Sequence, residues 1–248
     1  MIGTKINVVI PCYNEASKIG DVLKSVLELD FIGKVIVVDD FSADNSVEII
    51  KKYPVILLKN PQNKGAGYSI VRGLKHSYSL GNANFTITVD ADGQHKKEDI
   101  ETLYNSVRGI DNKILLIHAY RVQDKSTPIQ KRISNLLAHI AVLLIYQVNV
   151  KDPYCGLRMY HNSIIPEISF RNRFEWCADC AVLINSLKRQ SLAIPVKAHY
   201  SNYSLSKGLN LSQGFRLFFR LLKSRFKTKS YEENIGNNTS LLSSNWRN

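Results

Sequence analysis

Short runs of apolar residues, many of them β-branched, recur along the first half of the chain. They cover residues 6–10, 35–38, 55–58, 85–89 and 114–117. Each run is bounded by polar segments and is too short for a helix, so we expect each to form a buried strand.

The segments between these runs show helical periodicity. The clearest pattern follows the i, i+3, i+4, i+7, i+8 spacing of a buried helical face: Ile19, Val22, Leu23, Val26 and Leu27. Ser17 is placed to cap this helix, and further helices are expected over residues 47–50 and 68–78. Strands that alternate with helices predict an α/β fold with a mostly parallel sheet, right-handed crossovers and flanking helices.

Acidic and amide residues follow three of the predicted strands, at residues 11–15, 39–44 and 90–95. Ligands of such sheets bind beyond the carboxyl ends of the strands, so these loops should share one edge. Asp90 and Asp92 would point to the same side if the strand geometry continued. Two carboxylates that close repel unless a cation lies between them, and oxygen ligands favour Mg²⁺ or Mn²⁺. The alternative is that Asp-Ala-Asp-Gly is only a capped turn.

Four motifs occur in order along this half of the chain: Pro11-x-Tyr13-Asn14-Glu15, Val37-Val38-Asp39-Asp40-x-Ser42-x-Asp44, Asn63-Lys64-Gly65-x-Gly67 and Asp90-Ala91-Asp92-Gly93-Gln94-His95. Together they resemble glycosyltransferase family 2, with its GT-A fold. The last motif is similar to the dolichol-phosphate mannose synthase and polyprenyl-phosphate glycosyltransferase branch. Looser similarity through Asp152-x-x-x-Gly156-Leu157-Arg158 and Ser206-Lys207 extends the resemblance over about residues 6–208.

The resemblance implies a set of site residues. Those expected to bind the nucleotide-sugar are Pro11, Tyr13, Asn14, Glu15, Val38, Asp40, Lys64, Asp90, Ala91, Asp92, Arg121 and Lys207. Those expected to surround the metal are Asp90, Asp92 and Gln94, and those expected to be catalytic are Asp92, Gln94 and Arg121. Arg132 and Ser134 are expected near the acceptor phosphate, and we add Arg158 as a candidate for the same phosphate. One departure is Ser201, where this branch usually carries an arginine six residues before Lys207.

The reaction expected from this resemblance is inverting transfer of a sugar, mannose or glucose, from a GDP- or UDP-linked donor to a polyprenyl or dolichyl phosphate. A bound cation would stabilise the leaving diphosphate. A phosphate acceptor is already anionic and needs no strong general base. One alternative is transfer to a sugar hydroxyl of a glycolipid or polysaccharide, with Glu175 or Asp179 as the base. Another is a basic nucleic-acid-binding α/β protein, although no nucleic-acid-binding motif is present.

The positive charge lies in the second half of the chain. Residues 1–119 carry 14 basic and 14 acidic side chains, whereas residues 120–230 carry 18 and 5. Such a block suits an anionic partner such as a phosphate or an acidic membrane. Residues 214–227 alternate bulky and basic side chains, as interfacial helices do. Residues 136–148 are nearly all apolar and could form either a core helix or a membrane contact, but are too few to span a bilayer.

We expect one GT-A domain over residues 1–227, with a nucleotide-sugar half at 1–119, an acceptor half at 120–208, an amphipathic helix at 209–227 and a polar, disordered tail at 228–248. Four cysteines without a dense framework, and no signal peptide, predict a cytoplasmic protein. It would attach peripherally to the cytosolic membrane face. The resemblance leaves membrane-embedded partner subunits as an open alternative.

Overall fold

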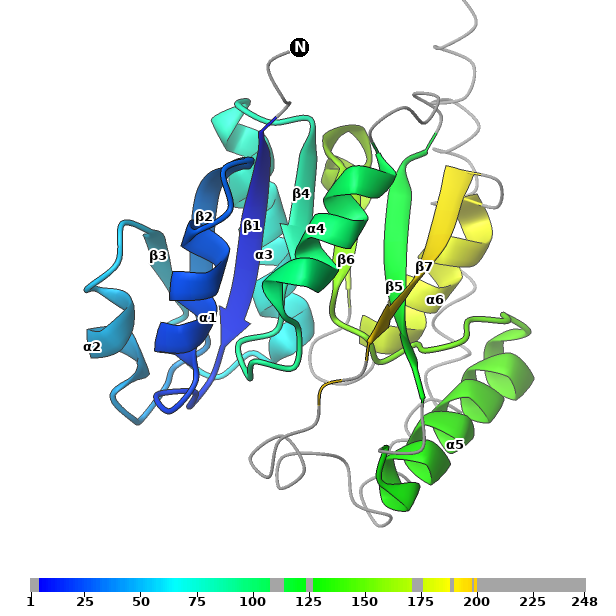
Figure 1. Ribbon diagram of the computed structural model, residues 1–248. Coiled ribbons are helices and arrows are strands. Elements are labelled where there is room, and N and C mark those ends of the chain that lie inside the picture. The colour runs from blue at the N-terminus through cyan, green and yellow to red at the C-terminus, as the bar shows by residue number, and fades with distance from the viewer. Residues whose placement is uncertain are drawn as a thin grey trace, which may run out of the picture.

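The computed structural model describes residues 5–107, 114–123, 127–170, 176–187, 190–197 and 199 (Figure 1). In chain order the elements of this part are β1 (Ile6–Cys12), α1 (Ile19–Leu27), β2 (Ile32–Asp39), α2 (Ser46–Ile50), β3 (Ile56–Lys59), α3 (Ala66–Leu80), β4 (Phe85–Thr88), α4 (Lys97–Ser106), β5 (Leu116–Val122), α5 (Ile129–Tyr146), β6 (Arg158–His161), the 3₁₀ helix η1 (Asn162–Glu167), α6 (Trp176–Leu187) and β7 (Ser191–Lys197).

The described strands form one sheet in the order β3-β2-β1-β4-β6-β5-β7. β6 is antiparallel to both of its neighbours, and all other pairs are parallel. The carboxyl ends of the parallel strands therefore share one edge, the lower edge in Figure 1. The strand order reverses beside β1 and β4, which is where ligands of such sheets bind.

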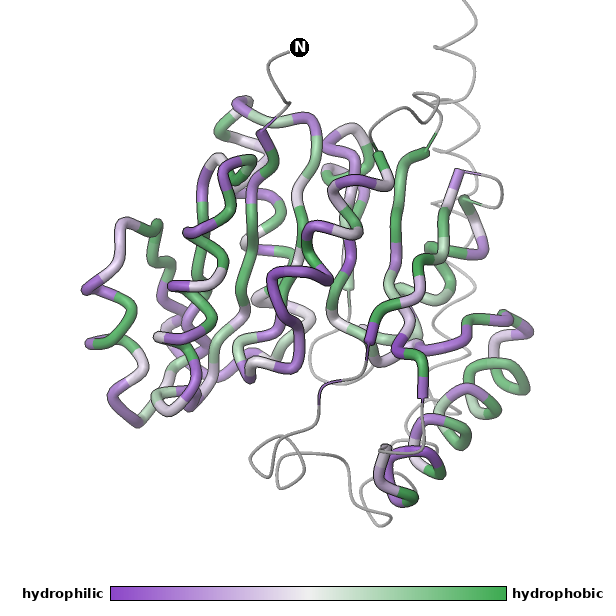
Figure 2. Tube along the Cα trace, viewed as in Figure 1, coloured by the Kyte–Doolittle hydropathy of each residue, from purple (hydrophilic) through white to green (hydrophobic). Residues whose placement is uncertain are grey.

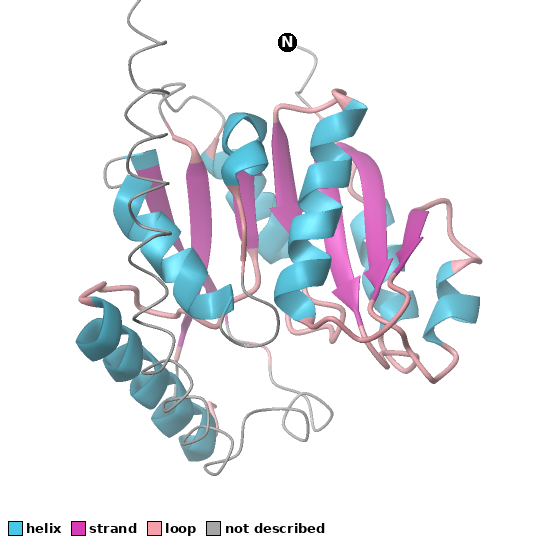
Figure 3. Ribbon diagram, turned by 180° about the vertical axis from the view of Figure 1, so that it is seen from behind, coloured by secondary structure: helices cyan, strands magenta, loops and turns pink. Residues whose placement is uncertain are grey.

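Helices cover both faces of the sheet. α1 and α4 lie on the face toward the viewer in Figure 1, and α3 and α6 lie on the other face, as the reverse view in Figure 3 shows. The apolar stripe predicted for α1 is buried against the first face. α3 packs Ile70 and Leu74 into the core of the second face. It comes so close that a Cβ at Gly73 would lie 3.1 Å from Val38 Cγ2.

The five strands predicted from sequence are all present, although β5 begins and ends later than its apolar run suggested. Ser17 as the helix cap is wrong. α1 begins at Ile19 without a side-chain cap, and the Glu15 carbonyl accepts hydrogen bonds from the amides of Lys18 and Ile19, both at 2.9 Å. β6 and β7 were not predicted.

The apolar segment at residues 136–148 lies mostly within α5. This helix stands at the lower edge of the sheet in Figure 1, following the end of β5. Of the helices that the structure describes, none is both long and apolar enough to cross a bilayer. The expected helix at 209–227, the tail at 228–248 and Lys207 lie outside the described residues, and the division into halves stays a prediction.

Candidate active site

The loops that follow β1 and β2 are joined by hydrogen bonds. The Asn14 amide donates to Ser42 Oγ at 3.0 Å, and Asn14 Oδ1 accepts from the Ala43 amide at 2.8 Å. The Glu15 amide donates to Ser46 Oγ at 2.8 Å. Asn14 adopts φ 53°, a left-handed conformation that asparagine tolerates better than most residues. Asn14, expected to bind the nucleotide-sugar, therefore helps to fix this part of the edge.

Asp40 connects β2 to the loop before α3. It is 4% exposed, and its carboxylate accepts from the Asn60 side chain at 2.7 Å and from the amides of Lys64 and Gly65 at 2.8 and 2.7 Å. These three donors use both carboxylate oxygens. The structure thus gives Asp40 a supporting role under the Lys64 loop, and its nucleoside contact stays a prediction.

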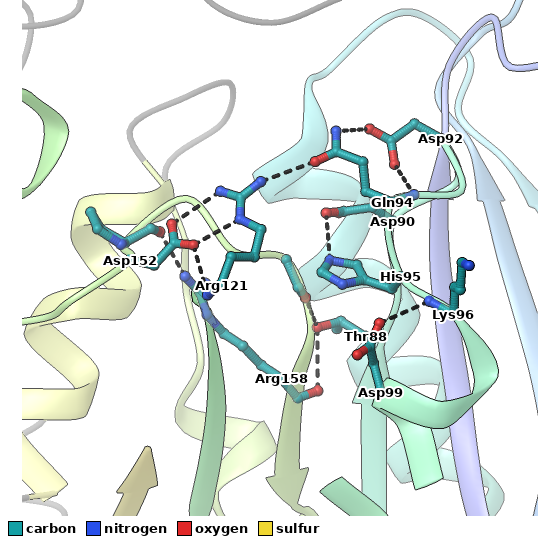
Figure 4. A network of polar contacts seen from close by, with 12 residues as sticks. Thr88, Asp90, Asp92, Gln94, His95, Lys96, Asp99, Arg121, Asp152 and Arg158 are labelled. Atoms are coloured by element: carbon teal, nitrogen blue, oxygen red, sulfur yellow. Dashed lines mark hydrogen bonds and ion pairs between the residues drawn. The ribbon is translucent and has the colours of Figure 1, made fainter. Parts of the chain in front are cut away.

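Asp90, Asp92 and Gln94 form a turn after β4. The strand ends at Thr88, so it is this turn, rather than continued strand geometry, that brings the two carboxylates near each other. Gly93 adopts φ 77° within it. Asp92 Oδ1 accepts from the Gln94 amide at 3.0 Å, and the Gln94 side-chain NH₂ donates to Asp92 Oδ2 (Figure 4). The turn chemistry considered from sequence is therefore present.

The two carboxylates of this turn have opposite pKa shifts. Burial and the charge of Asp90 raise the pKa of Asp92. Burial would also raise the pKa of Asp90, but His95, Arg121 and Arg158 outweigh it and lower that pKa. His95 Nε2 lies 3.4 Å from Asp90 Oδ2 beneath the turn. The described cations therefore favour the charged form of Asp90 more than that of Asp92.

Arg121, at the end of β5, joins this turn to the segment before β6. Its guanidinium binds the Asp152 carboxylate through two hydrogen bonds, Nε to Oδ2 at 2.7 Å and Nη2 to Oδ1 at 3.0 Å. Its Nη1 donates to Gln94 Oε1 at 3.0 Å. Burial alone would raise the pKa of Asp152, but Arg121 outweighs it and lowers that pKa. A continuous polar chain thus runs from Asp152 to Asp92 (Figure 4).

Gly156 forms the wall behind Asp90. A Cβ at this position would lie 2.5 Å from Asp90 Cγ and closer still to both carboxylate oxygens. The Gly156 carbonyl also accepts a hydrogen bond from Thr88 Oγ1 at 2.7 Å, which holds the segment against β4. Only glycine leaves room for the Asp90 carboxylate in this position.

Arg158 does not lie where an acceptor phosphate could reach it. It is 1% exposed, its Nη2 donates to the Pro153 carbonyl at 2.7 Å, and its guanidinium stacks over the Trp176 ring at 4.7 Å. The expectation that Arg158 binds this phosphate is therefore wrong for this conformation, because the side chain is enclosed beneath Asp152. Its charge acts on the site by lowering the pKa values of Asp90 and Asp152.

The first turns of α5 carry the other expected acceptor residues. Arg132 and Ser134 are both half-buried, and Ser134 Oγ donates to the Gln130 carbonyl at 2.8 Å within the helix. Their neighbour Lys131 was not predicted. Burial and the nearby charge of Arg121 lower the pKa of Lys131, and Asp92 partly opposes this. Lys131 therefore lies close enough to Arg121 and Asp92 for their charges to change its pKa.

The remaining expected residues differ in accessibility. Tyr13 is 47% exposed, and Pro11 is half-buried beside it. Val38 and Ala91 are buried in the core, which leaves only their backbone for a ligand. Asp179, the alternative general base, is 2% exposed on α6, and Glu175 lies outside the described residues, as does Ser201.

Comparison with known proteins identifies the family. A sequence model of the family "Glycosyl transferase family 2" matches residues 7–169. The chain belongs to this family. A UDP-N-acetylglucosamine--dolichyl-phosphate N-acetylglucosaminyltransferase from Methanococcus voltae is 31% identical over 88% of this chain and 94% of its own length. An undecaprenyl-phosphate 4-deoxy-4-formamido-L-arabinose transferase from Edwardsiella ictaluri is 28% identical over 83% of this chain and 65% of its own length.

Solved structures agree on the fold. Glucosyl-3-phosphoglycerate synthase from Mycobacterium tuberculosis, in complex with UDP, superposes with a TM-score of 0.69 and 16% identity, over 90% of this glycosyltransferase and 80% of that chain. A complex of the same enzyme with Mn²⁺, UDP and glucosyl-3-phosphoglycerate gives a TM-score of 0.62 at 19% identity, and the match covers 90% of this chain and 80% of that chain. The predicted GT-A fold is thereby confirmed.

Sequence reasoning missed Asp152, Gly156 and Lys131 as site residues. Asp152 and Gly156 belong to the motif Asp152-x-x-x-Gly156-Leu157-Arg158, in which neither residue was predicted to have a role. Lys131 directly precedes Arg132, and nothing in the local pattern distinguished the two cations. Only the folded arrangement brings Lys131 within reach of the charges of Asp92 and Arg121.

Proposed function

We propose that this glycosyltransferase transfers a sugar, with inversion, from a nucleotide-sugar to the phosphate of a polyprenyl lipid. The observation that carries the proposal is the chain of contacts from Asp92 through Gln94 and Arg121 to Asp152, with Lys131 beside it. It places carboxylates suited to a donor's cation next to side chains suited to an anionic acceptor. The names of the two relatives, with dolichyl and undecaprenyl phosphate, support this acceptor class.

The donor would lie across the carboxyl ends of β1, β2 and β4. The exposed Tyr13 and the loop held by Asp40 flank this edge, and they support a nucleoside position between them. UDP is the diphosphate in the Methanococcus relative's name and in the structural complexes, which makes UDP-linked sugars the first donors to test, with GDP-linked sugars second.

The residues present fit a divalent cation. The described residues contain no group of three His, Cys, Asp or Glu side chains placed to hold a metal. The ligands that we propose from the protein are the carboxylates of Asp90 and Asp92 and the amide oxygen of Gln94. Mg²⁺ and Mn²⁺ accept such partial sets and leave further positions to substrate phosphates. Burial and the neighbouring charge of Asp90 raise the pKa of Asp92, and a cation between the two carboxylates would favour their charged forms. When bound, the cation would act as a Lewis acid on the leaving diphosphate.

The protein's own residues would bring the two phosphates together. Two anions repel, so an acceptor phosphate needs cations beside the donor. Arg121 is held by Asp152 and directed toward Gln94. Lys131 and Arg132 stand on the first turns of α5. We assign these three cations to the acceptor and leaving phosphates.

A phosphate acceptor also agrees with the surroundings of the alternative base. Transfer to a sugar hydroxyl would need a carboxylate able to accept its proton. Asp179 is only 2% exposed on α6, and Glu175, the other candidate base, lies outside the described residues. We further propose that the enzyme works peripherally on the cytosolic face of its membrane.

A panel of labelled nucleotide-sugars tests the function. Each donor would be incubated with the full chain, Mg²⁺ or Mn²⁺ and a polyprenyl phosphate, and the lipid phase would be counted. We expect one donor to yield an acid-labile lipid-linked sugar, and chelation with EDTA to abolish it. Label that enters only hydroxyl acceptors would overturn the proposal.

A further inference from the structure

One face of α5 is aliphatic and exposed. Thirteen large apolar side chains are exposed in the described part of the chain, and seven of them belong to this helix. They are between 37% and 65% exposed: Ile129, Ile133, Leu136, Leu137, Ile140, Leu143 and Leu144. Their spacing of three, four and one residues places them along one side of the helix. Apolar patches this continuous mark interaction sites.

The opposite side of α5 anchors the helix to the protein. Ala141, Val142, Ile145 and Tyr146, all in its last two turns, are buried in the core. The first three turns contain no buried residue. The ribbon shows this helix at the edge where the strands end, set apart from the sheet, and hydrophobic positions recur along it (Figures 1 and 2). The aliphatic face is therefore presented by a fixed helix.

The charge of α5, and of the sequence on either side of it, suits an anionic bilayer. The sequence of α5, IQKRISNLLAHIAVLLIY, contains two cations and no carboxylate. Lys131 and Arg132 follow its first residue, and residues 120–230 carry 18 basic against 5 acidic side chains. Aliphatic residues flanked by cations are typical of helices that lie at the level of lipid headgroups. A second copy of this helix would offer no carboxylate to pair with these cations.

The position of α5 links this face to the active site. Arg121 stands near the end of β5, and α5 begins at Ile129 at the same edge of the sheet (Figure 1). The charges of Arg121 and Asp92 also act on Lys131 in the first turn of α5. The amino end of the helix therefore lies beside the polar chain of the site. An interfacial helix lies roughly 5–10 Å deep in the headgroup region. A bilayer against α5 would therefore hold lipid phosphates at the level of this edge.

We infer that the aliphatic face of α5 docks this enzyme onto an anionic membrane and so positions the site at the phosphate of the lipid acceptor. The inference rests on the proposed lipid acceptor. Vesicle binding needs no donor and no turnover, however, so the docking surface and the proposed reaction can fail separately.

The test is flotation of the full chain with vesicles of phosphatidylcholine and phosphatidylglycerol. The variant is Leu136→Ser with Leu144→Ser, which removes two of the most exposed leucines, at 56% and 64%. The matched control is Tyr78→Ser with Leu80→Ser, two exposed apolar residues at the end of α3, on the opposite edge of the sheet. We expect the α5 variant to lower the vesicle partition coefficient by about tenfold or more and the control to leave it unchanged.

Three outcomes would overturn the inference. The first is binding of the α5 variant equal to that of the unaltered protein. The second is a lower melting temperature of the α5 variant with vesicle binding unchanged, which would mean that another segment of this chain covers the face. The third is a dimer that the variant converts to a monomer in light scattering without any vesicle binding. Support would come from an environment-sensitive dye on Leu144→Cys that shifts to the blue with vesicles, whereas the same dye on Tyr78→Cys does not; the four described cysteines are buried.

Discussion

Gly156→Ala tests whether the position of the Asp90 carboxylate matters for transfer. The added Cβ would lie 2.5 Å from Asp90 Cγ, whereas carbon atoms in contact lie about 3.5 Å apart. The carboxylate must therefore move by about 1 Å. A displacement of that size can lower the rate about 100-fold, or about 2.7 kcal/mol of transition-state stabilisation. Overpacking should also lower the free energy of unfolding by about 1–3 kcal/mol.

A double-mutant cycle with Asp90→Ala separates displacement of Asp90 from general damage. Once the carboxylate is removed, the alanine at position 156 has space, so kcat/KM of the double variant should match that of Asp90→Ala alone. Gly20→Ala, on α1, is the matched control. Its Cβ would lie 3.3 Å from the Tyr53 hydroxyl and 3.4 Å from the Ile49 side chain, and no atom of Asp90 lies within 4 Å of it. This control variant should keep full activity. A kcat/KM of Gly156→Ala within twofold of the unaltered enzyme would refute this reasoning.

Three further changes probe other parts of the structure. Asp152→Asn removes one charge of a buried pair, so thermal unfolding should show a loss of about 2–4 kcal/mol and turnover should fall as Arg121 loses its support; an unchanged melting curve would contradict this. Asp40→Ala releases the two loop amides that it binds, which should speed their hydrogen exchange and raise the donor dissociation constant, and unchanged exchange would remove Asp40 from that role. Burial lowers the pKa of His118 from 6.5 to about 4, so the unfolded state takes up the proton first as the pH falls. The free energy of unfolding should therefore fall by about 3 kcal/mol between pH 6.5 and 4. If the free energy of unfolding of His118→Gln falls just as steeply over this pH range, the histidine is not the cause.

The parts of the fold that follow local rules could be predicted from sequence. Continuous β-branched runs identified the first five strands, and the apolar spacing of α1 identified its buried face. β6 could not be found in this way, because Arg-Met-Tyr-His is short and mostly polar. It is a strand because it pairs with β4 and β5, which are distant in sequence.

The same distinction explains the site. The acidic loops could be placed at one edge, because parallel strands end together. The partner of Arg121 could not be predicted, because Asp152 lies 31 residues away in the sequence. Asp152 contacts Arg121 only when the segment before β6 packs beside β5. The alternatives left open for residues 136–148 also depended on the fold, because an apolar segment does not reveal which of its sides will be covered.

The most direct test of the proposed reaction compares two acceptors that differ only in the phosphate. Release of nucleoside diphosphate would be followed with a polyprenyl phosphate and with the corresponding polyprenol, each with the donor found active and with Mn²⁺. The account predicts that only the phosphate stimulates release, and that Asp92→Ala abolishes the stimulation without unfolding the protein. Equal stimulation by the alcohol, or full activity of Asp92→Ala, would contradict it.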